Sequence, residues 1–163
     1  MRGPIDCRHF VGNVAASEGL LESIGDGETA DHVQQEAFMS VISQPAPAAT
    51  PIPGVSHATW AGHDDGLQQL SVWRQSVAAS GATPLHRHDI DEVVLCLSGR
   101  GELRIDGAVH TFHGGDTLVL PRASMHQIFN VGDQPLEIVG VFGGSPVQTW
   151  LPDGSALPLP WRT

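Results

Sequence analysis

The strongest constraint on this chain is a set of four polar side chains inside a stretch that otherwise has the pattern of β-strands. His86 and His88 are separated by one residue, Glu92 follows four residues later, and His126 lies beyond a further apolar run. Side chains alternate between the two faces of a strand, so His86 and His88 point the same way. Imidazole nitrogens and a carboxylate oxygen suit a divalent first-row metal. The spacing therefore predicts adjacent strands of a curved sheet that face one interior.

The apolar runs around these residues have the composition of short strands closed by turns. The runs at residues 93–97 and 118–120 end at a serine-glycine pair and at Pro121, and residues 126–129 form a further strand candidate. Asp106-Gly107 is a strong signal for a two-residue hairpin loop. Further strands are expected at residues 58–61, 69–78, 102–105, 109–112, 136–142 and 147–151. We find no internal repeat, which predicts one barrel and not a tandem pair.

Composition agrees with many short strands and excludes several classes of partner. The 163 residues suffice for one domain, and a charged fraction of 16% with 19 Gly and 12 Pro suits tight turns. A formal net charge of −10 argues against nucleic acid or an anionic membrane as a partner. No apolar run is long enough for a spanning helix, and the N-terminus lacks the apolar core of a signal peptide. Cys7 and Cys96 make no disulfide framework, so we expect a cytoplasmic protein with reduced thiols.

The residues around the first three candidate ligands resemble the first motif of the cupin family. That motif, G-x5-H-x-H-x3,4-E-x6-G, is matched at His86, His88, Glu92 and Gly99. Gly81 lies one residue closer to the histidines than the motif asks. This departure falls in a turn and leaves the candidate ligands in place.

The second cupin motif, G-x5-P-x-G-x2-H-x3-N, is matched further along the chain. Gly115, Pro121, His126 and Asn130 stand at the right spacings, and Ala123 replaces the second glycine. Again the departure lies in a turn. The resemblance covers about half the chain, and two linked patterns that hold all four ligands form a specific signal.

The resemblance implies an all-β fold, a double-stranded β-helix or jelly roll. Residues 57–163 would form the barrel, with a C-terminal strap over its surface. Residues 44–56 are a proline-rich linker, and residues 1–43 form an N-terminal extension with helical spacing in parts. The family resemblance further implies a homodimer.

The resemblance also implies a metal ion, one of Fe, Mn, Ni or Zn, held by His86, His88, Glu92 and His126. With Fe, the expected chemistry on a small organic substrate is dioxygenation. With Zn, Mn or Ni, it is isomerisation, cyclisation or lyase chemistry, with Glu92 as the catalytic group that moves a proton. The alternative is a cupin that binds or senses a small molecule without changing it. A fused DNA-binding segment is disfavoured, because residues 1–56 hold seven acidic residues and two arginines.

Strand alternation extends the candidate site to four pocket residues. Val94 and Cys96 share the strand face of the candidate glutamate, and Ile128 shares that of the last histidine. Arg74 lies on the same strand face as Val72. If that face points inward, the guanidinium would hold a substrate carboxylate in a bidentate pair. The alternatives are a buried core thiol for Cys96 and an edge or interface position for Arg74.

The remaining aromatic and imidazole side chains are given no role in the site. His57, His63, His110 and His113 are predicted to be surface residues, because they fall at or near expected turns. The four tryptophans are expected in the core or at an interface, unless one of them forms the floor of the cavity. Asn130 is expected to serve the turn that follows it.

Overall fold

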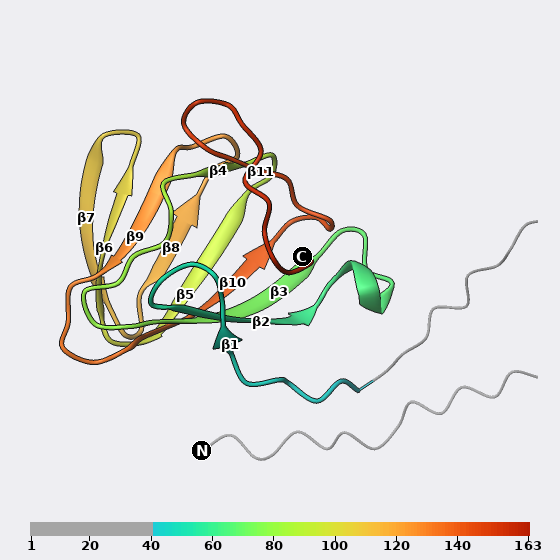
Figure 1. Cartoon of the computed structure of the whole chain (residues 1–163), viewed down its shortest axis with the longest axis horizontal. Coiled ribbons are helices and arrows are strands. Elements are labelled where there is room, and N and C mark those ends of the chain that lie inside the picture. The colour runs from blue at the N-terminus through green and yellow to red at the C-terminus, as the bar shows by residue number, and fades with distance from the viewer. Residues whose placement is uncertain (1–40) are drawn as a thin grey trace, which may run out of the picture. The chain divides into compact units, whose positions relative to one another are not determined.

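The structure is a computed structural model and describes residues 41–163. In this part of the chain every regular element except one short 3-10 helix is a β-strand, which confirms the predicted all-β class (Figure 1). The elements are β1 (Ala48–Ala49), β2 (Val55–Ala61), η1 (His63–Asp65), β3 (Ser71–Val77), β4 (Arg87–His88), β5 (Glu92–Ser98), β6 (Arg100–Ile105), β7 (Ala108–His113), β8 (Thr117–Leu120), β9 (His126–Asn130), β10 (Leu136–Phe142) and β11 (Thr149–Trp150).

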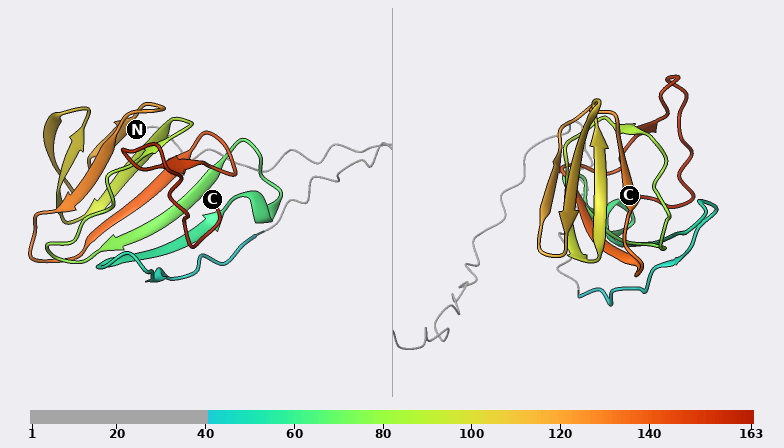
Figure 2. Two further views of the ribbon diagram at one scale, coloured as in Figure 1. Left: turned by 45° about the horizontal axis from the view of Figure 1, so that its top comes forward. Right: turned by 90° about the vertical axis from the view of Figure 1, so that its left-hand side faces the viewer.

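The strands form two facing layers. One layer is a six-stranded antiparallel sheet with the order β1-β2-β3-β10-β5-β8. The other contains the three-stranded sheet β7-β6-β9 and the pair β11-β4. Antiparallel bridges from Ala82 to Phe129 and from His86 to His126 join β9 to the chain that enters β4. Two further views show the strands of the two layers wrapped into the predicted double-stranded β-helix (Figure 2).

The inner faces of the layers share one hydrophobic core. On β3, Ser71, Trp73, Gln75 and Val77 are buried while the residues between them are partly exposed. The largest fully buried apolar side chains come from strands of the six-stranded sheet: Val77, Val94, Leu120, Leu136 and Ile138. This burial pattern decides which face of each strand points inward, and therefore which side chains reach the interior.

The predicted hairpin at Asp106-Gly107 joins β6 to β7. Ile105 pairs with Ala108 across the loop, so the connection has two residues. Asp106 and Gly107 have φ angles of 46° and 85°, the left-handed values that this class of tight hairpin loop requires. The Asp106-Gly107 dipeptide alone was therefore sufficient to predict this hairpin.

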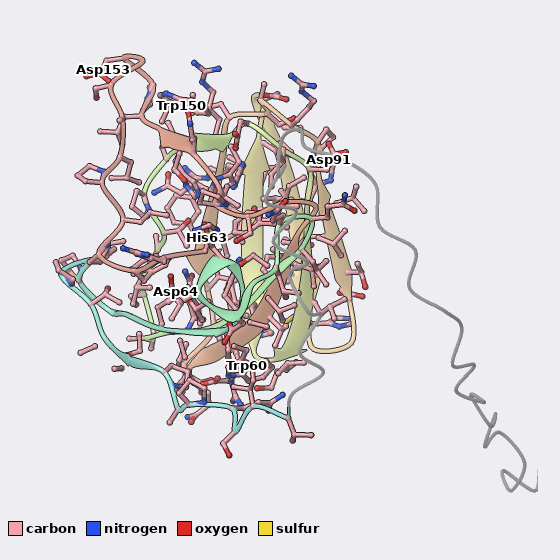
Figure 3. All side chains as sticks on the ribbon, turned by 90° about the vertical axis from the view of Figure 1, so that its right-hand side faces the viewer. Trp60, His63, Asp64, Asp91, Trp150 and Asp153 are labelled. Atoms are coloured by element: carbon pink, nitrogen blue, oxygen red, sulfur yellow. The ribbon has the colours of Figure 1, made fainter. Side chains whose placement is uncertain are left out.

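The segment after β11, drawn in red in Figure 1, is held against β2 and η1 by polar contacts. The Thr59 hydroxyl donates a hydrogen bond of 2.6 Å to the carbonyl of Arg162. Arg162 also forms an ion pair of 2.9 Å with Asp64, which is labelled on η1 in Figure 3. The Ser145 hydroxyl donates to the carbonyl of Thr163 at 2.5 Å. These contacts hold the C-terminal strap, residues 157–163, in a defined place.

The helices expected before residue 43 lie outside the described residues, so the division at residues 43 and 56 remains a prediction. β1 falls inside the proline-rich segment and pairs with β2 through Ala48 to His57. In the part of the chain that the structure describes, no helix is long and apolar enough to cross a membrane.

Candidate metal centre

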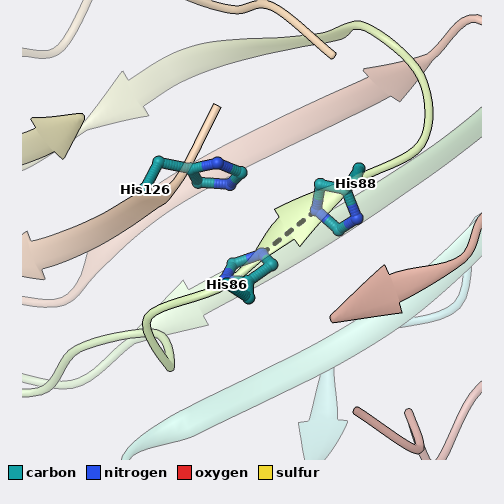
Figure 4. Close-up of side chains that lie close together, drawn as sticks. All are labelled: His86, His88 and His126. Atoms are coloured by element: carbon teal, nitrogen blue, oxygen red, sulfur yellow. Dashed lines mark hydrogen bonds between the residues drawn. The ribbon is translucent and has the colours of Figure 1, made fainter. Parts of the chain in front are cut away.

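Three imidazoles from neighbouring segments of the second layer converge inside the barrel (Figure 4). His88 lies on β4 and His126 begins β9. His86 is paired with His126 by an antiparallel bridge, so their side chains emerge side by side. One ligand nitrogen from each histidine lies within 4.8 Å of the others, and the Nε2 atoms of His86 and His88 are 3.0 Å apart. Local strand pairing therefore builds the cluster.

Glu92 approaches the same point from the facing layer. It is the first residue of β5 and only 4% exposed. Its Oε2 atom lies 3.6 Å from Nε2 of His88 and 3.5 Å from Nε2 of His126. The structure thus brings together the four side chains that the sequence predicted as metal ligands.

Backbone carbonyls fix the orientation of two of the rings. Nδ1 of His86 lies 2.7 Å from the carbonyl oxygen of Pro84, and Nδ1 of His126 lies 3.0 Å from that of Ser124. A carbonyl only accepts hydrogen bonds, so each Nδ1 carries the proton. A neutral imidazole then has an unprotonated Nε2 with its lone pair directed at the cluster, which is the arrangement that metal-binding histidines show.

His88 is oriented by a side chain as well as by the backbone of Gln148. Its Nδ1 lies 3.0 Å from the hydroxyl oxygen of Thr149 on β11, the strand that pairs with β4. With Nε2 directed at the cluster, Nδ1 donates this bond to the hydroxyl. All three rings therefore present the same nitrogen to one point.

Burial and mutual proximity keep the three imidazoles uncharged at neutral pH. Burial, reinforced by neighbouring His126, lowers the pKa of His86 to about 4. Burial, reinforced by the other two imidazoles, lowers the pKa of His88 to about 2. Burial raises the pKa of the Glu92 carboxyl to about 8, a cost that a bound cation would remove by favouring the carboxylate. Three neutral imidazole nitrogens and one carboxylate oxygen fit a divalent first-row metal.

The four residues lie on the wall of a small cavity of about 50 Å³. Most of its lining is apolar, and the strap closes one side with Leu157, Leu159 and Trp161. No arginine of the described chain lines it. The aromatic side chains of Trp73 and Phe142 also line it, with ring centroids 6.0 Å apart, and the Phe142 ring centroid lies 4.8 Å from that of His88. The site is therefore a largely apolar pocket whose wall carries the metal-binding group.

Of the four predicted pocket residues, the structure places one in the lining of the cavity and three outside it. Ile128 lines the cavity. Val94 and Cys96 share the inward face of Glu92, as alternation predicted, but they pack in the hydrophobic core and do not line the cavity. Their placement in the pocket was wrong, because β5 leads from the metal end of the barrel into its core, and for Cys96 the structure shows the alternative, a buried core thiol. Burial raises the pKa of the Cys96 thiol, in keeping with a core position.

The prediction that Arg74 reaches the pocket was also wrong. Arg74 lies on the outer face of β3, where its guanidinium pairs with Glu137 at 2.9 Å and stands 5.9 Å from the ring of Trp60. The inner face of β3 is the one that carries Trp73 and Val77, which are 5% and 0% exposed. Val72, on the same face as Arg74, is less deeply buried than these two.

His57 was wrongly predicted as a surface residue. It is 7% exposed, lines the cavity, and stacks on Trp161 with ring centroids 4.0 Å apart and an interplanar angle of 15°. Sequence reasoning left open whether a tryptophan lines the cavity, which Trp73 does, and it missed Gln75 as a cavity residue. The alternation on residues 69–78 already placed these two on one face, and choosing that face as the inner one would have found them. The other three histidines that were assigned to the surface are exposed: His63, His110 and His113.

Comparison with known proteins identifies relatives of this site and fold. The family model described as a Cupin domain matches residues 73–142. An auxin-binding protein of Nicotiana tabacum is 31% identical over 117 residues, which are 64% of this chain and 63% of that protein. Auxin-binding protein 1 of Arabidopsis thaliana is 29% identical over 109 residues, or 61% of this chain and 55% of that protein. The chain thus matches less than two thirds of the length of these relatives.

Solved structures show the same fold at lower sequence identity. A sugar phosphate isomerase of the cupin superfamily from Silicibacter pomeroyi has a TM-score of 0.55 at 24% identity, over 69% of this chain and 78% of that one. Oxalate decarboxylase from Lactobacillus farciminis has a TM-score of 0.54 at 22% identity, over 61% of this chain and 31% of that one. At these identities the likeness is one of fold.

Proposed function

Because the chain belongs to the cupin superfamily, we propose that it is a metal-dependent cupin that binds a small organic molecule in the cavity beside the four-residue cluster. The observation that carries this proposal is the common direction of the three imidazole Nε2 atoms. They meet the Glu92 carboxylate at the wall of an apolar cavity, so a ligand in that cavity would contact the metal directly.

His86, His88, Glu92 and His126 would hold one divalent ion, with Fe, Mn, Ni and Zn as candidates. When bound, the ion supplies an electrophilic position for an oxygen atom of the ligand. The chain itself orients the imidazoles through their Nδ1 hydrogen bonds and balances part of the charge with Glu92. The apolar walls exclude water from that end of the cavity, which strengthens electrostatic contacts there.

The shape and chemistry of the walls favour a ligand with an apolar, planar body and one oxygen-bearing acid group. Trp73, Phe142 and Trp161 supply aromatic surface. No arginine of the described residues lines the cavity to neutralise a second acid group such as a phosphate, and the chain has no lysine. A small aromatic acid satisfies these conditions, and the auxin-binding relatives support the same class of ligand.

The test is metal-dependent binding of an auxin. Protein loaded with Zn²⁺ or Mn²⁺ is titrated with indole-3-acetic acid while tryptophan fluorescence and heat are recorded. We expect saturable binding that disappears when the metal is removed with a chelator and returns on reloading. Equal binding with and without metal, or the failure of wild-type protein to retain any metal, contradicts the proposal.

Catalysis is the second candidate, and the placement of Glu92 favours it. The Glu92 carboxyl lines the cavity and reaches the cluster from β5, so it would lie beside a bound ligand and within reach of its protons. Dioxygenation with Fe, and isomerisation or lyase chemistry with Zn, Mn or Ni, both remain open under this candidate. Mass analysis of the ligand after incubation, with oxygen uptake for the Fe form, distinguishes turnover from passive binding.

We also propose a homodimer, formed through the outer face of the six-stranded sheet. Four valines lie in register across this face on β3, β10, β5 and β8: Val72, Val141, Val93 and Val119. Val119 is 67% exposed and belongs to the edge strand, so two copies can meet here through identical surfaces. Light scattering should give twice the chain mass, and Val119→Glu should shift it to the monomer. A monomeric wild type contradicts this assignment.

A further inference from the structure

The cavity has a second polar region, on the inner face of β3. Among residues 41–163, the buried side-chain oxygen and nitrogen atoms without a hydrogen-bond partner are Ser71 Oγ, Trp73 Nε1 and Gln75 Oε1. All three belong to alternate residues of this one strand. Trp73 and Gln75, which are 5% and 8% exposed, line the same cavity as the metal centre. A buried acceptor without a partner is costly, so one on a residue that lines a cavity calls for a partner that the chain does not supply.

A chain of hydrogen bonds determines which atom of Gln75 is left free. It begins at the strap, where the Thr59 hydroxyl lies 2.6 Å from the carbonyl oxygen of Arg162. A carbonyl cannot donate, so the single hydroxyl proton of Thr59 is used in this bond. The hydroxyl oxygen lies 3.1 Å from Nε2 of His57 and must accept from it. His57 therefore carries its proton on Nε2.

The remaining nitrogen of His57 then acts on Gln75. Burial lowers the pKa of His57 to about 4, so the neutral ring has one proton and Nδ1 is an acceptor. Nδ1 lies 3.2 Å from Nε2 of Gln75, whose amide group donates to it. The Gln75 oxygen is thereby turned away from His57 and left without a partner. The donor and the acceptor of each hydrogen bond in this relay, which runs from Thr59 through His57 to Gln75, therefore follow from the Arg162 carbonyl in the strap.

We propose that the ligand of this cavity carries a hydrogen-bond donor, in the simplest case a hydroxyl group, and that His57 imposes this requirement by holding the Gln75 oxygen as a free acceptor. The inference rests on the proposed binding function and specifies its ligand class as a hydroxylated organic acid. The acid group belongs at the metal centre and the hydroxyl at Gln75. A second carboxylate cannot take that place, because it only accepts hydrogen bonds and would face another acceptor. His57 is a positioning residue, since it acts through Gln75.

The first test measures the tautomer of His57 in zinc-loaded, ¹⁵N-labelled protein by long-range ¹H–¹⁵N correlation NMR. The His57 signals are assigned from their loss in His57→Phe. We expect a proton on Nε2 and none on Nδ1 at pH 7. A proton on Nδ1 overturns the inference, because the Gln75 amide would then present its oxygen to His57. This readout does not depend on knowing the ligand.

The second test compares matched probes on the same zinc-loaded protein: phenylacetate, its 3- and 4-hydroxy derivatives, and the corresponding methoxy derivatives. At least one hydroxylated acid should bind about tenfold more tightly than phenylacetate, and its methoxy counterpart should not, because a methoxy group cannot donate. In His57→Phe, which keeps an aromatic ring against Trp161, the hydroxyl preference should fall towards one. His57→Asn returns a side-chain acceptor and should restore part of it.

His110→Phe is the matched control, since it makes the same change at an exposed position of β7 and should keep the preference. Equal affinities for the hydroxylated and unsubstituted acids in wild-type protein overturn the inference while leaving metal-dependent binding intact. A preference that survives His57→Phe overturns the role of His57. If none of the acids binds to metal-loaded protein, the ligand class and the proposed function fail together. The tautomer of His57 still shows whether the hydrogen bonds from Thr59 to Gln75 have the proposed direction.

Discussion

The two polar regions of the cavity differ in how their hydrogen bonds are completed. At the metal centre, Nδ1 of each histidine has a partner in the protein, and Nε2 is reserved for a cation. On β3, the chain itself leaves an acceptor on Gln75 and a donor on Trp73 without a partner. The first region is therefore complete once an ion binds, whereas the second requires a ligand. On the proposed function, the fold would set the affinity for the metal, and the strap and β3 would set the specificity for the ligand.

Removing a ring from the metal centre should have the largest effect. His88→Ala deletes one of three nitrogens that meet at a single point, and Nε2 of His86, 3.0 Å away, loses its neighbour. We expect metal affinity to fall by more than about 100-fold, beyond the effect of losing an outer hydrogen-bond partner. Elemental analysis of purified protein measures it, with His110→Ala as the exposed control. Full metal content in His88→Ala would mean that the cluster does not hold the ion.

This contrast between the regions also explains what the sequence could predict. The metal centre is built from residues close in the chain, so the strand period and the spacing of His86, His88 and Glu92 identified it. His126 joined them through its own motif. The strand pattern and the Asp106-Gly107 turn likewise predicted most of the barrel.

The second region depends on packing between segments far apart in sequence. His57 is buried because the strap places Trp161 over it, a contact across about a hundred residues that no local pattern reveals. Gln75 reaches the cavity because it lies on the inner face of β3. The sequence did not show which face is the inner one, because the apolar Leu70 shares the outer face. Leu70 lies just before the strand and is 43% exposed. Where side chains alternate between two partly apolar faces, periodicity finds the strand and leaves its inner face undecided.

A side chain added at Gly140, against the ring of Trp73, should disturb the polar region on β3 and leave the metal centre unchanged. Gly140 on β10 pairs with Trp73, and a Cβ atom added to Gly140 would lie 1.9 Å from Cζ2 of the indole. Gly140→Ala must therefore displace the ring, at a cost of about 1–3 kcal/mol in the free energy of unfolding. Urea unfolding and the tryptophan emission maximum measure the two effects.

Gly143→Ala is the matched control, because a Cβ atom there would meet nothing within 4 Å. We expect Gly140→Ala to retain the metal content of wild-type protein and to lose affinity for the organic ligand. A joint loss of metal would show that the two regions are not independent.

Loosening one outer contact of the metal centre should have a smaller effect. Thr149→Val removes the hydroxyl that accepts the hydrogen bond from Nδ1 of His88 at 3.0 Å. We expect metal affinity to fall by about tenfold, at the lower end of what such contacts contribute, because β4 and β11 still hold the backbone in place. Competition with a chromogenic chelator measures the change. Thr111→Val, an exposed threonine on β7, should leave affinity unaltered, and an equal loss in both variants would contradict the assignment.

The smallest expected effect is a pH dependence that belongs to the second region. Burial lowers the pKa of His57 from 6.5 to about 4, so between these values the unfolded chain binds a proton that the folded protein does not. Proton binding then favours unfolding, and the unfolding free energy should decrease as pH falls from 6.5 towards 4, with no contribution from His57 above that range. Replacing His57 with Phe removes this term. In metal-free protein, melting curves of the variant should therefore decline less steeply with acid than those of wild type, by a few degrees at pH 5, roughly. Parallel curves would show that His57 is not held neutral, and the fixed hydrogen-bond direction that separates the two regions would be lost with it.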